Sequence, residues 1–180
     1  MAYQDALRIL QECPCADLIT DRSIVFPIFS GLFLALKFGQ IEQDVECSYE
    51  QNLVDRFVNE TKLHGDIIHY TRALSMQAEM YGRLRNYEKA FEVFEELQAT
   101  YDVDKHTVLI CEAYRSDLSA QCFGVSCLWL VLLDRKDEAL ARCEYIFKEL
   151  MPKMDIRNVH NSCTMLYPTI WVMKDANRSL

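Results

Sequence analysis

The residues best suited to metal chemistry are few and poorly spaced for it in this chain of 180 residues. Cys13 and Cys15 form the tightest cysteine pair, but their C-x-C spacing differs from the C-x2-C half-site that structural zinc uses. The histidines are His64, His69, His106 and His160. Because none of them has the H-x3-H spacing of a zinc site, we expect surface or capping groups there, and neither a metal site nor a cofactor.

Nucleophilic catalysis would need a Cys or Ser side chain held beside a general base. Cys122 lies close to Gly124 and Ser126, yet this cluster falls in an apolar run, where small residues let helices approach closely. The chain has no G-x-S-x-G elbow, no glycine-rich phosphate loop and no H-E-x-x-H motif. The sequence therefore predicts no catalytic residues, and an enzyme would have to assemble its site from distant positions.

The composition favours an all-α protein that does not bind nucleic acid. Hydrophobic residues make up 51% of the chain, and 5 glycines and 4 prolines leave few of the turn signals that an all-β chain needs. The formal charge of −8 disfavours partners rich in phosphate. The 8 cysteines are scattered and no export signal opens the chain, so we expect reduced thiols and a cytoplasmic or other reducing location.

The central stretch, Thr71 to Asp102, predicts two antiparallel helices joined by a tight polar turn. The first helix carries Leu74, Ala78 and Tyr81 on one face at helical spacing. The stripe on the second helix comprises Tyr87, Ala90, Phe94 and Leu97. Because the turn is too short for a crossover, the two helices must be neighbours, and further helices must cover their remaining apolar surface.

Similar helical segments occur on both sides of this hairpin. They are Tyr3–Cys13, Asp21–Phe38 and Tyr49–Glu60 before it, and Val103–Arg115, Leu118–Leu133, Glu138–Leu150 and Asp155–Met173 after it. The second helices align at Ala6, Asn52, Ala90 and Ala139, at intervals of 46, 38 and 49 residues. The apolar face predicted for Glu138–Leu150 comprises Ala139, Cys143, Ile146 and Phe147.

The most apolar segment, Ile24 to Leu36, contains Pro27 and is shorter than the roughly 20 residues that a membrane span needs. We therefore expect a buried helix and no membrane span. A membrane-associated role for this segment is the alternative.

The order Leu74, Ala78, Tyr81, Tyr87, Ala90 and Phe94 resembles the signature of a tetratricopeptide repeat. This resemblance implies an all-α fold, a right-handed stack of antiparallel helical hairpins with about eight or nine helices. We expect residues 1–180 to form a single helical-repeat domain. Because the chain opens on a second helix and stops where another would begin, we favour a fragment of a longer solenoid over a closed domain.

In tetratricopeptide arrays the first helices line a concave groove, so the resemblance also implies a site for a partner. The groove residues that it implies are Arg72, Ser75, Glu79, Arg83, Gln121, Val125 and Leu128. A partner helix or peptide with an apolar anchor would suit this surface, which implies a scaffold or regulatory module that binds a protein. The alternative is that Val125 and Leu128 pack on the neighbouring hairpin. A homo-oligomer or a larger parent chain would also satisfy this surface.

A second resemblance, to pentatricopeptide arrays that read RNA bases, rests on the run Ala90 to Leu97 followed by Asp104 to Thr107. The acidic charge weighs against it. RNA binding is therefore kept as an alternative to protein binding.

Overall fold

The structure is a computed structural model that describes residues 22–37, 47–64, 67–154, 158–160, 162–164, 166–167 and 169. This part of the chain is helical, with turns between the helices and no strand. The helices are α2 (Arg22–Lys37), α3 (Cys47–Leu63), α4 (Ile67–Arg83), α5 (Tyr87–Thr100), α6 (Val103–Tyr114), α7 (Leu118–Leu132) and α8 (Lys136–Tyr145). A π-helical turn, Ile146–Leu150, and a 3-10 turn, Met151–Lys153, continue α8. The predicted all-α class is confirmed for the described residues.

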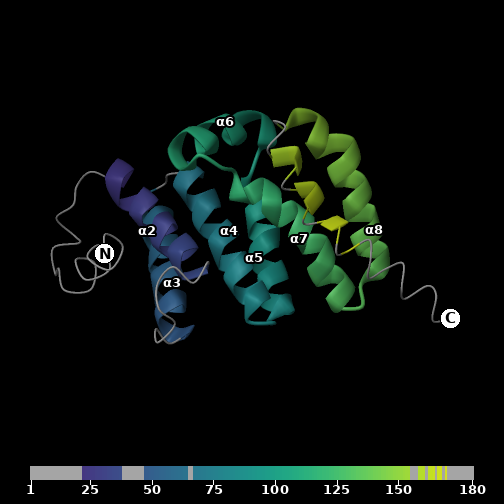
Figure 1. The fold of residues 1–180 in the computed structure, drawn as a ribbon, viewed down its shortest axis with the longest axis horizontal. Helices are drawn as coiled ribbons and strands as arrows, with labels where there is room; N and C mark the ends of the chain where they lie inside the picture. Colours follow the sequence, from purple (N-terminus) through teal and green to yellow (C-terminus); the bar gives the residue numbers. More distant parts are fainter. Residues whose placement is uncertain are drawn as a thin grey trace.

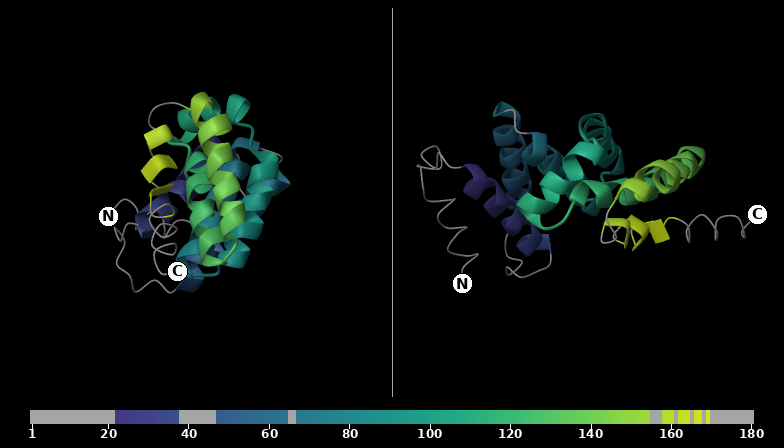
Figure 2. Two further views of the ribbon diagram at one scale, coloured as in Figure 1. Left: turned by 90° about the vertical axis from the view of Figure 1, so that its right-hand side faces the viewer. Right: turned by 90° about the horizontal axis from the view of Figure 1, so that it is seen from above.

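The helices form a row of hairpins, α2–α3, α4–α5 and α7–α8, that follow one another along the longest axis (Figures 1 and 2). Each first helix also contacts both helices of the preceding hairpin: α4 packs on α2 and α3, and α7 packs on α4 and α5. α6 lies outside this row, at the top of the view in Figure 1 and above α4 and α5, and it contacts α4 and α2. The hairpin predicted between Thr71 and Asp102 is confirmed, with its turn at residues 84–86.

The turns of hairpins α4–α5 and α7–α8 have the same geometry. Arg85 and Asp134 are both left-handed, with φ of 60° and 58°, and each ends a first helix. In the first turn, Arg85 N–H donates to the Gly82 carbonyl at 3.1 Å and Asn86 N–H donates to the Tyr81 carbonyl at 3.0 Å. In the second turn, Asp134 N–H donates to the Val131 carbonyl at 3.0 Å and Arg135 N–H donates to the Leu130 carbonyl at 2.8 Å. This is the Schellman pattern, which satisfies the last carbonyls of a helix. The two turns therefore match at an offset of 49 residues, which equals the interval between Ala90 and Ala139.

α2 is buried along its described inner face, as predicted for a segment too short to span a membrane. The Phe29 ring stacks on the Phe57 ring of α3, with centroids 5.3 Å apart, and Phe26 packs on the same ring at 5.7 Å. Leu32 and Phe33 of α2 are fully buried as well. Among the residues that the structure describes, no helix is both long and apolar enough to cross a bilayer.

Small side chains bring α4 and α7 close together. Ser75 Oγ lies 2.9 Å from Ser119 Oγ, and the Cys122 thiol donates to the Ser75 carbonyl at 3.3 Å. At the other end of the contact, a Cβ added to Gly82 would lie 2.6 Å from the indole nitrogen of Trp129. Glycine is therefore required where α7 places its tryptophan against α4. Core packing, the role predicted for Cys122, is confirmed.

Three details differ from the sequence-based predictions. Asn52 is exposed on α3, where it was aligned with a buried alanine, so α3 does not keep the register of α5 and α8 there. Phe147 is 46% exposed, because Ile146 and Leu150 are the residues that the π-helical turn directs inward. His69 is half-buried, with its ring against Phe26 and its Nδ1 hydrogen-bonded to the Tyr114 hydroxyl.

Several predictions fall outside the described residues. They are the opening helix Tyr3–Cys13 and the pair Cys13 and Cys15. The predicted helix Asp155–Met173 is described in part, and its described positions from 158 to 169 are helical.

Candidate interaction surface

Arg72, one of the predicted groove residues, is 1% exposed and holds three segments together. Its Nε donates to Ser30 Oγ of α2 at 3.0 Å, and its Nη1 donates to the Ser116 carbonyl at 3.1 Å. The guanidinium also lies 4.8 Å from the centroid of the Tyr114 ring. Burial lowers the Arg72 pKa to about 10, although Tyr114 and Asp117 oppose that shift. Because α2 and α6 cover this arginine, its side chain does not face solvent.

Ser75 is buried too. Its hydroxyl donates to the Thr71 carbonyl at 2.7 Å and also contacts the Ser119 hydroxyl. The remaining predicted groove residues are accessible to solvent to some degree: Glu79, Arg83, Gln121, Val125 and Leu128. Arg83 pairs with Glu50 of α3 and lies 5.5 Å over the Phe33 ring. Of the seven positions, Arg72 and Ser75 are thus buried between helices, and the other five are at least partly exposed.

A buried polar network fixes α6 and the start of α7. Asp117 is the N-cap of α7 and accepts from Ser119 N–H at 2.9 Å and Ala120 N–H at 3.3 Å. Its other oxygen accepts from the Tyr101 hydroxyl at 2.6 Å, which also lies 2.6 Å from Thr107 Oγ1 of α6. Burial raises the pKa of Tyr101, and the neighbouring Asp117 carboxylate raises it further. Burial also raises the Asp117 pKa, against the hydrogen bonds that the carboxylate accepts.

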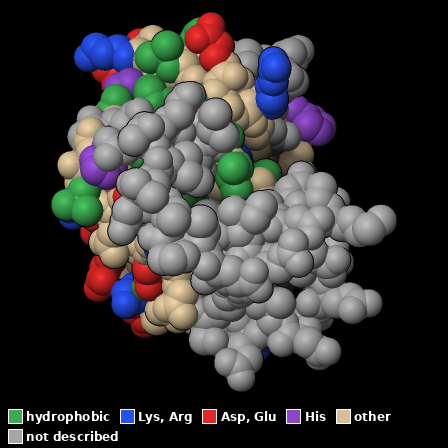
Figure 3. All heavy atoms as spheres, turned by 90° about the vertical axis from the view of Figure 1, so that its left-hand side faces the viewer, with side chains coloured by type: hydrophobic (Ala, Val, Ile, Leu, Met, Phe, Trp, Pro, Cys, Tyr) green, Lys and Arg blue, Asp and Glu red, His purple; other side chains and the backbone are tan. Residues whose placement is uncertain are grey.

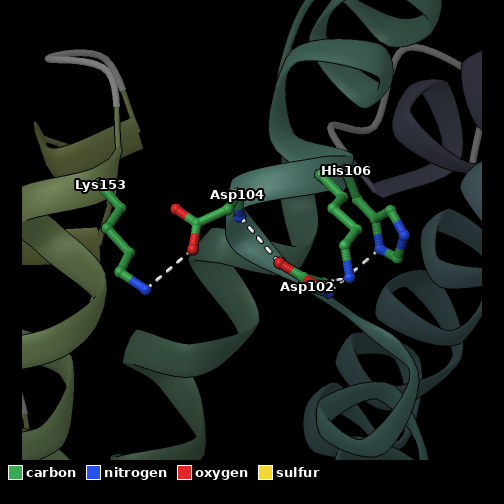
Figure 4. A network of polar contacts seen from close by, with 5 residues as sticks. Asp102, Asp104, His106 and Lys153 are labelled. Atoms are coloured by element: carbon green, nitrogen blue, oxygen red, sulfur yellow. Dashed lines mark hydrogen bonds and ion pairs between the residues drawn. The ribbon is translucent and has the colours of Figure 1, made fainter.

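The N-terminus of α6 is held by a second set of contacts, which Figure 4 shows. Asp102 caps α6 by accepting from Asp104 N–H at 3.0 Å, and the Asp102 N–H donates to His106 Nδ1 at 3.0 Å. Asp104 in turn pairs with Lys153 of the 3-10 turn at 2.9 Å. His106 therefore acts in capping, as predicted, and the ion pair bridges α6 to the segment after α8.

Two clefts lie on either side of this ion pair. The larger, of about 600 Å³, lies between α6 and the 3-10 turn, and Val103, Thr107, Cys111 and Met154 form its less polar wall. Its charged lining comprises Asp104, Glu112, Arg115 and Lys153. The smaller, of about 310 Å³, lies between the α5–α6 junction and the end of α8, and its lining is mainly polar. Both clefts share Val103, Asp104 and Lys153.

Two large aliphatic side chains are exposed on α6, and the first of them lines the larger cleft. Val108, which also lines the cleft, is 63% exposed and Leu109 is 48% exposed, whereas Thr107 and Ile110 face the core. The sequence predicts this helix but not that it forms the wall of a cleft. The apolar run Val108-Leu109-Ile110 indicates exposed apolar residues on this helix, because three consecutive side chains cannot all fit on the single buried face of a short amphipathic helix.

The described residues hold no group of three His, Cys, Asp or Glu side chains arranged to bind a metal ion. Charged side chains of both signs are interspersed on the described part of the face at the α2–α3 end (Figure 3). No family model, no curated protein and no solved structure matches this chain.

Proposed function

We propose that this protein is an interaction module that binds a helix or an extended peptide of a partner protein. The observation that carries the proposal is the cleft of about 600 Å³ between α6 and the 3-10 turn, with Val108 and Leu109 exposed beside it. Clefts of this size accept side chains of a peptide, and exposed aliphatic residues next to a cleft add apolar contact area. The charged residues around the cleft supply polar contacts that orient a bound segment.

We also propose that the hairpins stack as in tetratricopeptide arrays. The proposal is supported by the matched turns at Arg85 and Asp134 and by the contact of each first helix with both helices of the preceding hairpin. In such a stack, Glu79, Arg83, Gln121, Val125 and Leu128 would provide a second contact surface. Arg72 and Ser75 would join helices instead.

The charge of the chain supports a protein partner over RNA. The chain has a net charge of −8 and therefore lacks the excess of Lys and Arg that neutralises phosphates. RNA binding of the pentatricopeptide kind would need basic residues along one face. A reducing, cytoplasmic location remains part of this proposal. It is supported by the scattered spacing of the cysteines and by the burial of Cys122, Cys127 and Cys143 in the core, which is typical of reduced thiols.

The proposal is tested by placing a photo-crosslinking amino acid at position 108 and, as a matched control, at position 63. Leu63 is 77% exposed on α3 and lies outside the α6 cleft. Crosslinking in a lysate of the native source, with and without ribonuclease, is followed by identification of the attached protein or RNA. We expect one protein to be captured from position 108 only, in both samples.

Competition and substitution sharpen this test. A synthetic peptide from the captured protein should bind the purified chain, and Val108→Asp combined with Leu109→Asp should weaken that binding at least tenfold, whereas Leu63→Asp should leave it unchanged. Capture of RNA, lost after ribonuclease treatment, would favour the pentatricopeptide-like alternative. Equal capture from positions 108 and 63 would show that the α6 cleft is not the binding site.

A further inference from the structure

One face of α6 lines the larger cleft along the whole length of the helix. The lining residues recur at the spacing of helical turns: Asp104, Thr107, Val108, Cys111, Glu112 and Arg115. At a rise of 1.5 Å per residue, this wall is about 17 Å long, or about three helical turns. Lys153 and Met154 lie on the opposite side of the cleft. The length of this wall sets the length of the segment that can lie along it.

The walls of the cleft favour a helix over an extended peptide. The described part of the chain contains no strand, so an extended peptide finds no sheet edge to which it could add. The described residues that line the cleft include no aromatic side chain on which a polyproline segment could pack, and Arg115 is the single arginine among them, whereas phosphate motifs are bound by clusters of arginine. The mode of recognition that fits these walls is an amphipathic helix with its apolar face in the groove.

The charged side chains at the two ends of the cleft differ in whether they are already paired. At the start of α6, Asp104 is paired with Lys153 at 2.9 Å (Figure 4), so these two charges offset each other. At the other end, Glu112 and Arg115 are exposed, and neither forms an ion pair with another described residue. The charges available to a partner are therefore one anion and one cation near the C-terminal end of α6.

The order of these groups along α6 gives the direction in which a partner helix fits. Arg115 comes last, Glu112 lies about one turn earlier, and the exposed Val108 lies about one turn before that. An antiparallel partner helix begins beside Arg115, where its own N-terminal dipole favours a carboxylate in its first turn. Its next turn faces Glu112 and the turn after that faces Val108. The matching order on the partner is therefore acidic, basic and aliphatic.

We propose that the α6 cleft binds an amphipathic helix of a partner protein, antiparallel to α6 and about three turns long, that carries an acidic, a basic and an aliphatic side chain in this order on one face. The acidic side chain pairs with Arg115, the basic one pairs with Glu112, and the aliphatic one packs on Val108. This inference rests on the proposed function, because it names the kind of segment that the cleft accepts. Ion pairs at a surface contribute modestly, so the charges select the direction of the helix and the apolar contact supplies most of the affinity.

The test uses the full chain and synthetic peptides of about 15 residues. The first peptide is held helical by a hydrocarbon staple on its outer face, and carries Glu, Lys and two Leu residues one turn apart, in this order, on the other face. The second differs only in that its Glu and Lys are exchanged, and the third has the first sequence without the staple and with two prolines on the outer face. By fluorescence anisotropy at low salt, we expect the first peptide to bind about fivefold more tightly than the second and at least about tenfold more tightly than the third.

Charge-exchanged variants of the chain test the assignment of the two ion pairs. Glu112→Arg combined with Arg115→Glu keeps the net charge and should reverse the preference between the first and second peptides. Glu144→Lys combined with Lys148→Glu is the matched control, because it exchanges the charges of an exposed ion pair outside the cleft and should leave that preference unchanged. Circular dichroism spectra would verify that both variants fold.

Several outcomes would overturn this inference and leave the proposed function standing. One is equal binding of the first two peptides, weakened by Val108→Asp combined with Leu109→Asp, and another is a preference for the third peptide. Self-association of the chain in analytical ultracentrifugation, abolished by the same double substitution, would make a second copy the occupant and would also overturn it. If no peptide bound at millimolar concentration, the inference would fail, and the crosslinking from position 108 would decide the proposed function separately.

Discussion

The hairpins α4–α5 and α7–α8 share a turn but differ in what surrounds them. α4 has a partly exposed flank, at Gln77 and Glu79, whereas most of α7 is buried. α5 starts with a capping side chain, since Asn86 Oδ1 accepts from Lys89 N–H at 3.3 Å, whereas Arg135 provides no such bond to α8. The two hairpins thus share a turn, but they differ in how far the first helix is buried and in whether a side chain caps the second helix.

This difference shows which features the two hairpins share and which depend on position. Both hairpins have a left-handed residue in the turn and a buried alanine, Ala90 or Ala139, because the tight turn and the close approach of the helices require them. The capping side chains and the charged side chains differ between the two hairpins, since contacts with neighbouring helices can replace their contribution to stability. The four predictions below test this division, in order of decreasing expected effect.

Asp117→Ala should destabilise the α7–α8 hairpin most. It removes the cap of α7 and leaves the buried Tyr101 hydroxyl without its carboxylate partner, which together cost about 3 kcal/mol of unfolding free energy. Urea denaturation monitored by circular dichroism would measure the loss. Asp117→Asn is the matched control, because its amide oxygen can still accept from Ser119 N–H, and it should cost less than half as much. A loss below about 1 kcal/mol for the alanine variant would contradict the role given to this network.

Gly82→Ala should be the next most harmful change, because it inserts a methyl group where Trp129 of the other hairpin packs. The added Cβ would lie 2.6 to 2.9 Å from three atoms of the indole ring. Overpacking of this kind costs about 1 to 3 kcal/mol, against a gain of up to about 1 kcal/mol in helix propensity. Thermal melts of the variant would report the net loss.

A double-mutant cycle isolates this contact between hairpins. In a Trp129→Leu background, Gly82→Ala should become neutral or stabilising, because the ring it strikes is gone. Equal penalties in both backgrounds would mean that Gly82 is required for a reason other than Trp129.

The existence and approximate positions of the helices could be predicted from the sequence because they depend on local signals, although the π-helical end of α8 could not. The apolar stripe of Leu74, Ala78 and Tyr81, followed by a polar turn, indicated α4 and its end. The surroundings of Arg72 could not be predicted, because its partners Ser30, Tyr114 and Ser116 lie more than 40 residues away in the chain. Periodicity identifies which face of a helix is apolar, but not which distant segment covers a polar residue.

The α6 cleft illustrates the same limit. A helix from Val103 was predicted from its own residues, yet its position across α4 depends on Tyr101, Thr107 and Asp117 meeting in space. The cleft also needs Lys153, whose ion pair with Asp104 spans 49 residues. Such a site arises only once the chain has folded.

The caps at the two turns provide a third and smaller test. Asn86→Ala should cost about 1 kcal/mol, because it removes the side-chain acceptor at the start of α5. Arg135→Ala should cost less than Asn86→Ala, since it removes an exposed ion pair with Glu138 and a contact with the Phe91 ring 4.6 Å away, which together are worth about 0.5 kcal/mol. Urea denaturation at low and high salt separates the two. In roughly 1 M salt, which screens ion pairs at the surface, the part of the Arg135→Ala loss that comes from the ion pair should disappear. The loss of unfolding free energy in Asn86→Ala should persist.

The smallest expected effect concerns the left-handed residues that end α4 and α7. Arg85→Gly should stabilise the chain by about 0.5 kcal/mol, because glycine avoids the left-handed strain of about 1 to 2 kcal/mol but loses more backbone entropy on folding. Asp134→Gly should gain less, since aspartate tolerates this conformation better than arginine does. Arg85→Ala is the control for loss of the side chain, and it should leave the melting temperature nearly unchanged. If Arg85→Gly and Asp134→Gly were equally stabilising, the two turns would be equivalent in energy as well as in geometry, and the difference between the hairpins would lie entirely in their surroundings.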